Sequence, residues 1–412
     1  MPFRLGGFLV TSLPPANTLR LQSYRTLEDL HSLLPAWERL LTEYPKATTF
    51  STWEWLSSWW RSFGNAQQLL VLGGFKDSEL IGLAPFSLAR QNFSPGISLR
   101  ILKLMGDGSG DSDNLDLPVK PGNEEIFARS VVDYLMSERR SWDVCQLNTL
   151  PPDSALASLL SEEAARRGCL TFEYRRTASA ITLPATWEEY LAQLSSEDQK
   201  NLVRYDRRLA KRYRVRIYRC TEADDLPRVL EAMFKLHQAR WEDEGESGSF
   251  KDPARRNFYY HLSRALLTRG RLELWVLELD DNVASAQYAF RHGDAVFQLQ
   301  EGNDPARSSD RVGFILRGHV IRHLIGEGVR VYDFLGGAPG YKARWGAKET
   351  YYQNIHFARR FSVGGAVLWS THSWSQLKHS LRRRLPVRAW SVLHQLNLAM
   401  RNQKSKRRPE NL

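Results

Sequence analysis

Apolar residues along the chain fall into short runs and helical spacings, a pattern typical of mixed α/β proteins. The first half opens with a tryptophan-dense segment, residues 36–64, whose spacing predicts helix, with Ser51 or Thr52 as an N-cap. Beyond it the pattern predicts strands at 68–74, 79–88, 99–105, 142–147 and 169–174, and helices at 123–138 and 154–167. The first two strands form a hairpin, because a short polar turn separates them.

A second unit of similar plan begins at Ile181. A long basic helix from Ser195 or Ser196 to Lys211 opens this unit. The pattern then predicts strands at 215–219, 272–279, 283–291, 295–300 and 329–335, and helices at 224–241, 253–268 and 313–326. Turn residues separate the three central strands, which indicates an antiparallel meander. The predicted fold class is therefore α/β with mixed sheets.

Length and composition agree with a globular protein of two domains. The chain has 412 residues, 42% of them hydrophobic and 25% charged, and domains typically have roughly 100–200 residues. No stretch approaches the ~20 consecutive apolar residues that a membrane-spanning helix needs. The apolar patch near the start is too short for a secretory signal. We expect a soluble, cytoplasmic protein.

Most of the excess positive charge lies at the end of the chain. Of the net charge of +11, residues 376–412 contribute +9, from ten basic residues and one acidic residue. The rest is nearly neutral, which argues against a DNA-binding protein. Residues 386–400 have helical apolar spacing between two basic clusters. Such a helix can lie on an anionic membrane surface or pack on the body with its charges solvated, and both interpretations remain open.

Several reaction classes lose support because their motifs are missing. The sequence has no dinucleotide-binding glycine motif, Walker loop, nucleophile elbow or HExxH zinc motif. Its three cysteines are far apart, so we expect neither disulfides nor a metal site. A glycine-rich loop at 106–113, with the neighbouring Asp116, could hold a cation, an amino group or a sugar. A solvated acidic loop is the favoured interpretation.

Residues 296–346 contain the most informative segment. A strand, a loop and a helix opening at Gly313 follow one another, and Arg307 and Arg311 flank the loop. Backbone N–H groups at the start of a helix, together with arginines, form a device for binding a pyrophosphate. Taken alone the signal is weak, because any connection from a strand to a helix offers such N–H groups.

A set of short motifs makes the sequence resemble a known family. The motifs include Phe234, His237, Arg240 and Trp241, then Gly248-Ser249-Phe250, Phe258-Tyr259, Asp280-Asp281, the segment Ser308 to Gly313, Tyr332 to Gly337, and Tyr341-Lys342 with Trp345-Gly346. They resemble the CelD-like GNAT acyltransferases found with cellulose and exopolysaccharide synthesis, which are similar in turn to the FemABX aminoacyltransferases. The likeness is good over residues 185–350 and thinner over 25–180.

The resemblance implies two tandem GNAT-like folds and direct transfer of an acyl group from acyl-coenzyme A to an amine or hydroxyl. The implied domains are 1–180 and 181–360, the second carrying the active site, followed by a basic amphipathic tail at 361–412. The residues implied to grip the coenzyme are Arg307, Ser308, Ser309, Arg311, Val312 and Gly313. Asp310, inside this loop, would repel a phosphate if it faced the ligand.

Direct transfer needs a base for the amine, a group for the oxyanion and a proton for the leaving thiolate. The resemblance makes Lys342 the candidate for the oxyanion or a donor phosphate, with an exposed surface lysine as the alternative. Tyr341 would protonate the thiolate or else only pack. Glu301 is the first choice as base, with Asp304 beside it and Asp333 on the neighbouring strand.

The acceptor side is implied by a second group of residues. His237 and Arg240, three apart on one helix, can point at one ligand, although a lone helical histidine is more often structural; Trp345 flanks the Lys342 motif. The helix from Ser196 carries Lys200, Arg204, Arg207, Arg208, Lys211 and Arg212. This face is either solvated or binds an anionic glycan or a lipid-linked phosphate.

The predicted function is acyl transfer from acyl-CoA, such as acetyl-CoA, to a sugar or polysaccharide precursor, without a metal. One rival is a FemABX-like transferase that uses aminoacyl-tRNA, the only case in which tRNA would be a partner. The other is a degenerate fold acting as a membrane-docked scaffold. A peripheral position on the inner membrane face, through the basic tail, accompanies these hypotheses.

Overall fold

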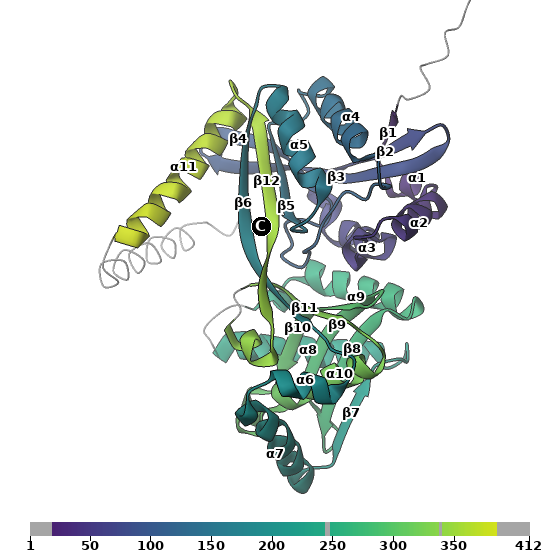
Figure 1. Cartoon of the computed structure of the whole chain (residues 1–412), viewed down its shortest axis with the longest axis vertical. Helices are drawn as coiled ribbons and strands as arrows, with labels where there is room; N and C mark the ends of the chain where they lie inside the picture. Colours follow the sequence, from purple (N-terminus) through teal and green to yellow (C-terminus); the bar gives the residue numbers. More distant parts are fainter. Residues whose placement is uncertain (1–18, 244–247, 338–339, 385–412) are drawn as a thin grey trace, which may run out of the picture.

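The computed structural model describes residues 19–243, 248–337 and 340–384, which build a mixed sheet of twelve strands (Figure 1). The strand order is β1-β2-β3-β4-β5-β12-β6-β11-β10-β9-β8-β7. The strands are β1 Arg20–Tyr24, β2 Gln67–Lys76, β3 Glu79–Ser94, β4 Ile97–Leu104, β5 Val144–Leu150, β6 Cys169–Thr182, β7 Val215–Arg219, β8 Leu272–Leu279, β9 Asn282–His292, β10 Ala295–Asn303, β11 Val331–Gly336 and β12 Lys348–Arg359. The predicted α/β class is confirmed.

The sheet repeats one arrangement twice. In each half four strands run antiparallel, β1 to β4 and β7 to β10, and a parallel strand follows, β5 or β11. Each parallel pair is joined over only three residues of each strand before the two strands separate. The halves therefore share one architecture, as the similar order of their predicted elements indicated.

Two long strands cross between the halves. β6 and β12 pair antiparallel along Cys169–Ala180 and Lys348–Arg359. β12, which ends the second half, pairs with β5 of the first, whereas β6, from the first half, pairs with β11 of the second. Neither half completes its sheet from its own sequence, and residue 180, the predicted domain boundary, lies inside β6.

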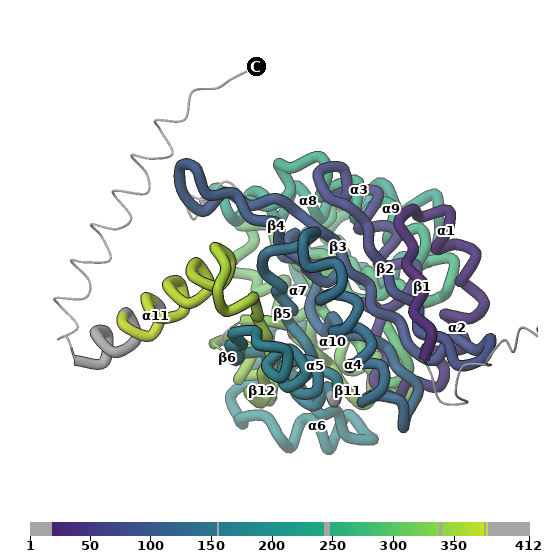
Figure 2. The backbone as a smooth tube through the Cα atoms, turned by 90° about the horizontal axis from the view of Figure 1, so that it is seen from above, coloured from purple at the N-terminus to yellow at the C-terminus, as the bar shows by residue number. Residues whose placement is uncertain are grey.

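Eleven α-helices of the described residues cover the sheet (Figures 1 and 2). They are α1 Leu27–His31, α2 Leu34–Glu43, α3 Trp53–Phe63, α4 Glu124–Ser137, α5 Ala155–Arg166, α6 Trp187–Gln193, α7 Ser196–Arg212, α8 Leu226–Asp243, α9 Pro253–Thr268, α10 Val312–Gly326 and α11 Val363–Arg384. Thr52, one of the two predicted caps, accepts the Trp55 N–H at the start of α3. No helix in this part of the chain is long and apolar enough to cross a bilayer.

Aromatic side chains of α3 fill the space between the halves. Trp55 is fully buried, and its ring lies 5.3 Å from Phe258 of α9 and 5.1 Å from Phe290 of β9. Its indole N–H donates to the Ser112 hydroxyl. The tryptophan-dense segment thus forms the core that joins the two halves.

Several elements differ from the pattern-based expectation. β6 extends eight residues beyond the predicted strand, whereas α6, β12 and α11 were not predicted. Gln353, Asn354 and His356 interrupt the apolar pattern of β12. Two of them make hydrogen bonds in the sheet: Asn354 accepts the Thr149 N–H, and His356 contacts Asn148. α11 packs on the sheet through Leu368 and projects from the body, as Figure 2 shows. The helix predicted at 386–400 lies outside the described residues.

The shared core makes a prediction about stability. Trp55→Ala should lower the free energy of unfolding by about 3–5 kcal/mol, because it opens a cavity between the halves. The control is Trp369→Ala on α11, where the side chain is 59% exposed and the expected change is within about 0.5 kcal/mol. Urea unfolding of both variants measures the difference. Equal effects would contradict the assignment of Trp55 to the joint core.

Candidate active site

The candidate site lies where β10 and β11 separate. The two parallel strands pair only through Ala295–Phe297 and Val331–Asp333. A register shift between Gln298 and Gln300 follows in β10, which then continues to Asn303 against β9 alone. Such irregularities change the direction of a strand. The separation leaves room at the carboxyl ends of the strands, close to the start of α10.

The start of α10 offers main-chain N–H groups to this space. A 3-10 helix, Pro305–Asp310, leads into the helix, and Arg311 has a left-handed conformation with φ of 60°. No side chain of the described residues caps this end. A Cβ at position 313 would lie 2.4 Å from the Asn303 amide oxygen, so any other residue there would displace that side chain. An uncapped helix start with close backbone approach is suited to an anion.

Asp310 does not face the cleft. Its side chain is buried, pairs with Arg212 of α7 at 2.6 Å and accepts a hydrogen bond from the Tyr213 hydroxyl at 3.1 Å. These contacts neutralise the carboxylate away from the lining of the cleft. The repulsion expected from this aspartate is therefore absent, because the side chain anchors the loop to α7.

The cleft has a volume of about 470 Å³ and a basic lining. It contains most of the residues predicted from the sequence: Arg240, Glu301, Asp304, Arg307, Ser308, Arg311, Val312, Gly313, Tyr341 and Trp345. Arg317, Arg344 and Phe314 also line it. Five arginines and two carboxylates thus surround one space, which gives a positive field.

Glu301 and Arg317 form an ion pair inside the cleft. Arg317 is almost completely buried, and its guanidinium lies 5.2 Å from the Tyr341 ring and 5.6 Å from the Trp345 ring. Burial opposes its charge, but Glu301 raises the pKa of Arg317 and keeps it cationic. Its Nε has no hydrogen-bond partner among the described residues. A buried donor of this kind is costly unless a ligand or water satisfies it.

Tyr341, Trp345 and Asp304 complete the predicted lining. Tyr341 is 50% exposed, and burial of its hydroxyl end together with Glu301 raises its pKa. Trp345 is buried against Phe314, with ring centres 4.7 Å apart. Asp304 accepts the Ala306 N–H at 3.0 Å and so caps the 3-10 helix. Of these three residues, we take Tyr341 as the one whose polar group, the hydroxyl, could exchange a proton in the cleft.

Lys342 and Asp333 lie outside the lining of this cleft. The Lys342 ammonium donates to the carbonyls of Phe334 and Gly336, both at 3.3 Å. Burial lowers the pKa of Lys342, although Asp333 and Asp113 oppose the shift. Burial also raises the pKa of Asp333 to about 6, against a hydrogen bond from the Leu335 N–H. Both residues lie at the seam between the halves, behind the lining of the cleft, although Lys342 still interacts electrostatically with Glu301 and Arg317.

The glycine-rich loop of the first half forms the other side of that seam. Asp113 accepts the Gly336 N–H at 2.8 Å and pairs with Arg176. Asp111 accepts the Tyr259 hydroxyl, at 3.0 Å, and Asp116 the Ser154 hydroxyl, at 2.9 Å. The expectation of a solvated acidic loop is wrong, because these three carboxylates are buried and hydrogen-bonded. No group of metal-ligating side chains occurs in the described residues.

His237 and Arg240 lie in different surroundings, and only Arg240 lines the cleft. His237 is buried in α8, where its Nε2 accepts the Trp241 indole N–H at 3.0 Å. Burial and Arg240 lower the pKa of His237 to about 4, so the imidazole is neutral near pH 7. Arg240 lines the cleft. Ser309 is exposed at the edge of the loop, where its carbonyl accepts a hydrogen bond from Arg208.

The second half matches a known domain family. The sequence profile described as the acetyltransferase (GNAT) domain matches residues 196–343, from α7 to the turn that carries Lys342. Residues 196–343 therefore match a GNAT acetyltransferase domain, which confirms this part of the resemblance. The narrower cellulose and exopolysaccharide group stays a prediction. A search of curated protein sequences gave no significant match.

Solved structures are similar to this chain at low sequence identity. A crystal structure of FemX has a TM-score of 0.56 and 11% identity, covering 85% of this chain and 99% of the FemX chain. The C-terminal domain of a putative lysylphosphatidylglycerol synthetase from Agrobacterium fabrum has a TM-score of 0.47 and 11% identity. This match covers 83% of this chain and 96% of the other. A tandem GNAT protein from the clavulanic acid biosynthesis pathway has a TM-score of 0.44 and 13% identity. This match covers 82% of this chain and 98% of the other. The FemX comparison shows a common fold.

The raised pKa of Asp333 predicts a pH-dependent stability difference. A buried carboxyl whose folded pKa is above its unfolded value stabilises the fold below about pH 4, and this contribution is lost as the pH rises towards 6. Asp333→Asn cannot ionise. The unfolding free energy of the variant, relative to the unmodified protein, should therefore rise between pH 4 and 6 and level off above it.

Urea unfolding at several pH values measures this difference. The control is Glu349→Gln on β12, which removes an exposed carboxylate and should give no such trend. If the unfolding free energy of Asp333→Asn, relative to the unmodified protein, fell between pH 4 and 6, the pKa of Asp333 would not be raised in the folded protein.

Proposed function

We propose that the chain is an acyl-CoA-dependent N-acyltransferase whose donor lies in the cleft between β10, β11 and the start of α10. The observation that supports this most directly is the uncapped start of α10 beside Arg307 and Arg311, with Asp310 turned away. A pyrophosphate carries two negative charges and several acceptor oxygens, which match N–H groups and guanidinium groups. Acyl-CoA is a co-substrate in this proposal, and no metal takes part.

The reaction we infer is direct attack by an amine on the thioester carbonyl. Glu301 removes a proton from the ammonium form of the acceptor, directly or through one water, and the neutral amine forms the new bond to the acyl carbon. Arg317 holds Glu301 in the cleft through their ion pair. As the C–S bond breaks, the Tyr341 hydroxyl gives its proton to the coenzyme thiolate, and the second proton lost by the attacking nitrogen, passed through water, restores the hydroxyl. A hydroxyl acceptor would lose its proton along the same route.

Lys342 and Asp333 have supporting roles in this proposal. Because the ammonium holds the carbonyls of Phe334 and Gly336, it fixes the turn that presents Tyr341. Lys342 is thus a positioning residue here rather than the group that meets the oxyanion. Asp333, next to the same turn, compensates the positive charge of Lys342.

For the acceptor we propose an amino sugar or another precursor of an exopolysaccharide. Arg240, Asp304 and Trp345 line the cleft beside Glu301 and offer a cation, a carboxylate and an aromatic edge. Sugars are commonly bound through such polar groups and an apolar surface. The work would take place in the cytoplasm, with the basic tail at 361–412 holding the protein at the inner membrane face.

Donor binding tests the first part of the proposal. Titration calorimetry should detect acetyl-CoA binding, and Arg311→Glu should weaken it by at least about 10-fold, because a carboxylate replaces a guanidinium beside the helix start. The control is Arg264→Glu, an exposed change on α9 outside the cleft, which should leave the affinity unchanged. Binding of aminoacyl-tRNA in place of acetyl-CoA would favour the rival transferase, and binding of neither would favour the scaffold.

The role of Glu301 makes a kinetic prediction. Glu301→Gln should reduce kcat for thiol release by about 10²–10⁴-fold and change the affinity for acetyl-CoA by less than about 3-fold. Asp304→Asn is the matched control, because asparagine also caps a helix start and the change removes a carboxylate from the same cleft. A larger loss of kcat in Asp304→Asn than in Glu301→Gln would show that the base is misassigned.

A further inference from the structure

The exposed face of α7 carries a regular basic stripe. Lys200, Arg204, Arg207 and Lys211 follow at intervals of four, three and four residues, so they lie on one side of the helix, and all four are exposed. Arg204 is held by hydrogen bonds to Asn201 and to the Tyr205 hydroxyl. The buried residues of α7 are Asp198, Asn201 and Leu209. The stripe therefore faces outward, at the lower end of the view in Figure 1.

The groove beneath this stripe is partly apolar. Leu191 of α6 and Val203 of α7 line it together with the basic side chains. Val203 is 50% exposed and, with Leu191, gives the groove an apolar surface beside its cations. A groove that is charged along one edge and apolar at its base suits a molecule with both properties.

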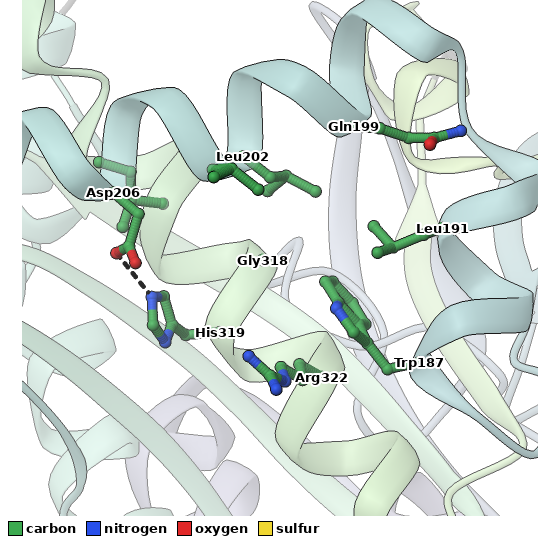
Figure 3. A pocket seen from close by; sticks show the side chains of 10 residues that line it. Trp187, Leu191, Gln199, Leu202, Asp206, Gly318, His319 and Arg322 are labelled. Atoms are coloured by element: carbon green, nitrogen blue, oxygen red, sulfur yellow. Dashed lines mark hydrogen bonds and ion pairs between the residues drawn. The ribbon is translucent and has the colours of Figure 1, made fainter.

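A partly open, mainly apolar pocket adjoins the groove. It has a volume of about 110 Å³ and lies between α6, α7 and α10, as Figure 3 shows. Trp187, Leu191, Leu202, Val203 and Ile315 line its apolar part. The ion pair of His319 with Asp206, at 2.9 Å, lies at one side, and Arg322 lies near Trp187. Leu191, Gln199 and Val203 line both spaces, so the pocket and the groove are neighbours.

The shape of this pocket depends on one glycine. A Cβ at position 318 would lie 2.6 Å from a methyl group of Leu202. Glycine therefore allows α10 and α7 to approach closely below the pocket. Since α6 closes the other side, an apolar recess remains beside a helix whose outer face is cationic.

The same helix contacts the loop of the candidate active site. Arg208 donates to the Ser309 carbonyl, and Arg212 pairs with Asp310. The groove is thus separated from the active cleft by one helix and the loop attached to it. A ligand held on α7 would lie beside the cleft without occupying it.

We propose that the α6–α7 groove binds a single anionic lipid, with its phosphate on the basic stripe and part of a hydrocarbon chain in the apolar pocket. Charge complementarity accounts for the phosphate, and the half-exposed Val203 with the adjoining pocket accounts for the chain. A nucleic acid would use the stripe but leave the apolar surface without a partner. This site is separate from the donor cleft and does not depend on the reaction proposed for it.

Binding of short-chain lipids to the full-length protein tests the site. Dihexanoyl phosphatidic acid, used below its micelle concentration, should bind at least about 10-fold more tightly than dihexanoyl phosphatidylcholine, which has the same chains without net charge. It should also bind at least about 10-fold more tightly than glycerol 3-phosphate, which has the phosphate without chains. Titration calorimetry measures all three.

Two variants separate the charged and apolar contributions. Lys200→Glu combined with Arg207→Glu should weaken phosphatidic acid at least about 10-fold, whereas Arg129→Glu combined with Arg264→Glu changes the net charge equally and should not. Val203→Asn should weaken phosphatidic acid but leave glycerol 3-phosphate unchanged. Thermal unfolding confirms that each variant is folded, and acetyl-CoA affinity should stay unchanged in all of them.

Three outcomes would overturn the proposal. Equal affinity for the two lipids would show that the groove does not recognise the negative charge of the lipid. Equal weakening by both double variants would point to the general field of the protein rather than to α7. An RNA oligonucleotide that binds as tightly as phosphatidic acid, with no effect of Val203→Asn on either ligand, would assign the stripe to nucleic acid. Failure of acetyl-CoA binding would leave the lipid result intact.

Discussion

The crossed pairing of β6 and β12 is the constraint on which the rest of the structure depends. Each half needs a strand from the other to complete its sheet, so the halves cannot separate without exposing strand edges. The crossing fixes the distance between the glycine-rich loop and the turn at Gly336. At that distance Asp113 accepts the Gly336 N–H, and Lys342, which follows Tyr341 in the chain, donates to the Gly336 carbonyl.

Charge pairing gives the cleft its character. Each carboxylate near the start of α10 has a basic partner: Asp310 has Arg212, Glu301 has Arg317, and Asp198 has Arg344. Arg307 stacks over the Tyr213 ring, and Arg311 is exposed at the helix start. The pairing removes negative charge from the region where the helix start is positive. A basic lining can thus coexist with acids that fix the loop.

Local patterns predicted much of this structure. The meander β8 to β10, the helix at Gly313 and the cleft residues Glu301, Arg311 and Tyr341 were visible in sequence, because turn residues, helix starts and short motifs are local signals. β12 was not, since its partners lie some 180 residues away in sequence and its polar residues acquire hydrogen bonds only in the folded sheet. The pairing of Arg317 with Glu301 joins different elements, and the burial of Asp113 depends on the other half. Such contacts do not change the spacing of apolar residues along the chain, so the sequence pattern cannot predict them.

The first half has its own separated parallel pair, and one hydrogen bond spans it. Asn148 of β5 donates to Asp107, directly after β4, at 2.9 Å, and the loop that follows is drawn into the seam. Of the two equivalent positions in the sheet, the one in the first half is bridged by this hydrogen bond, whereas the one in the second half borders the cleft. The proposed function therefore assigns one donor to each molecule.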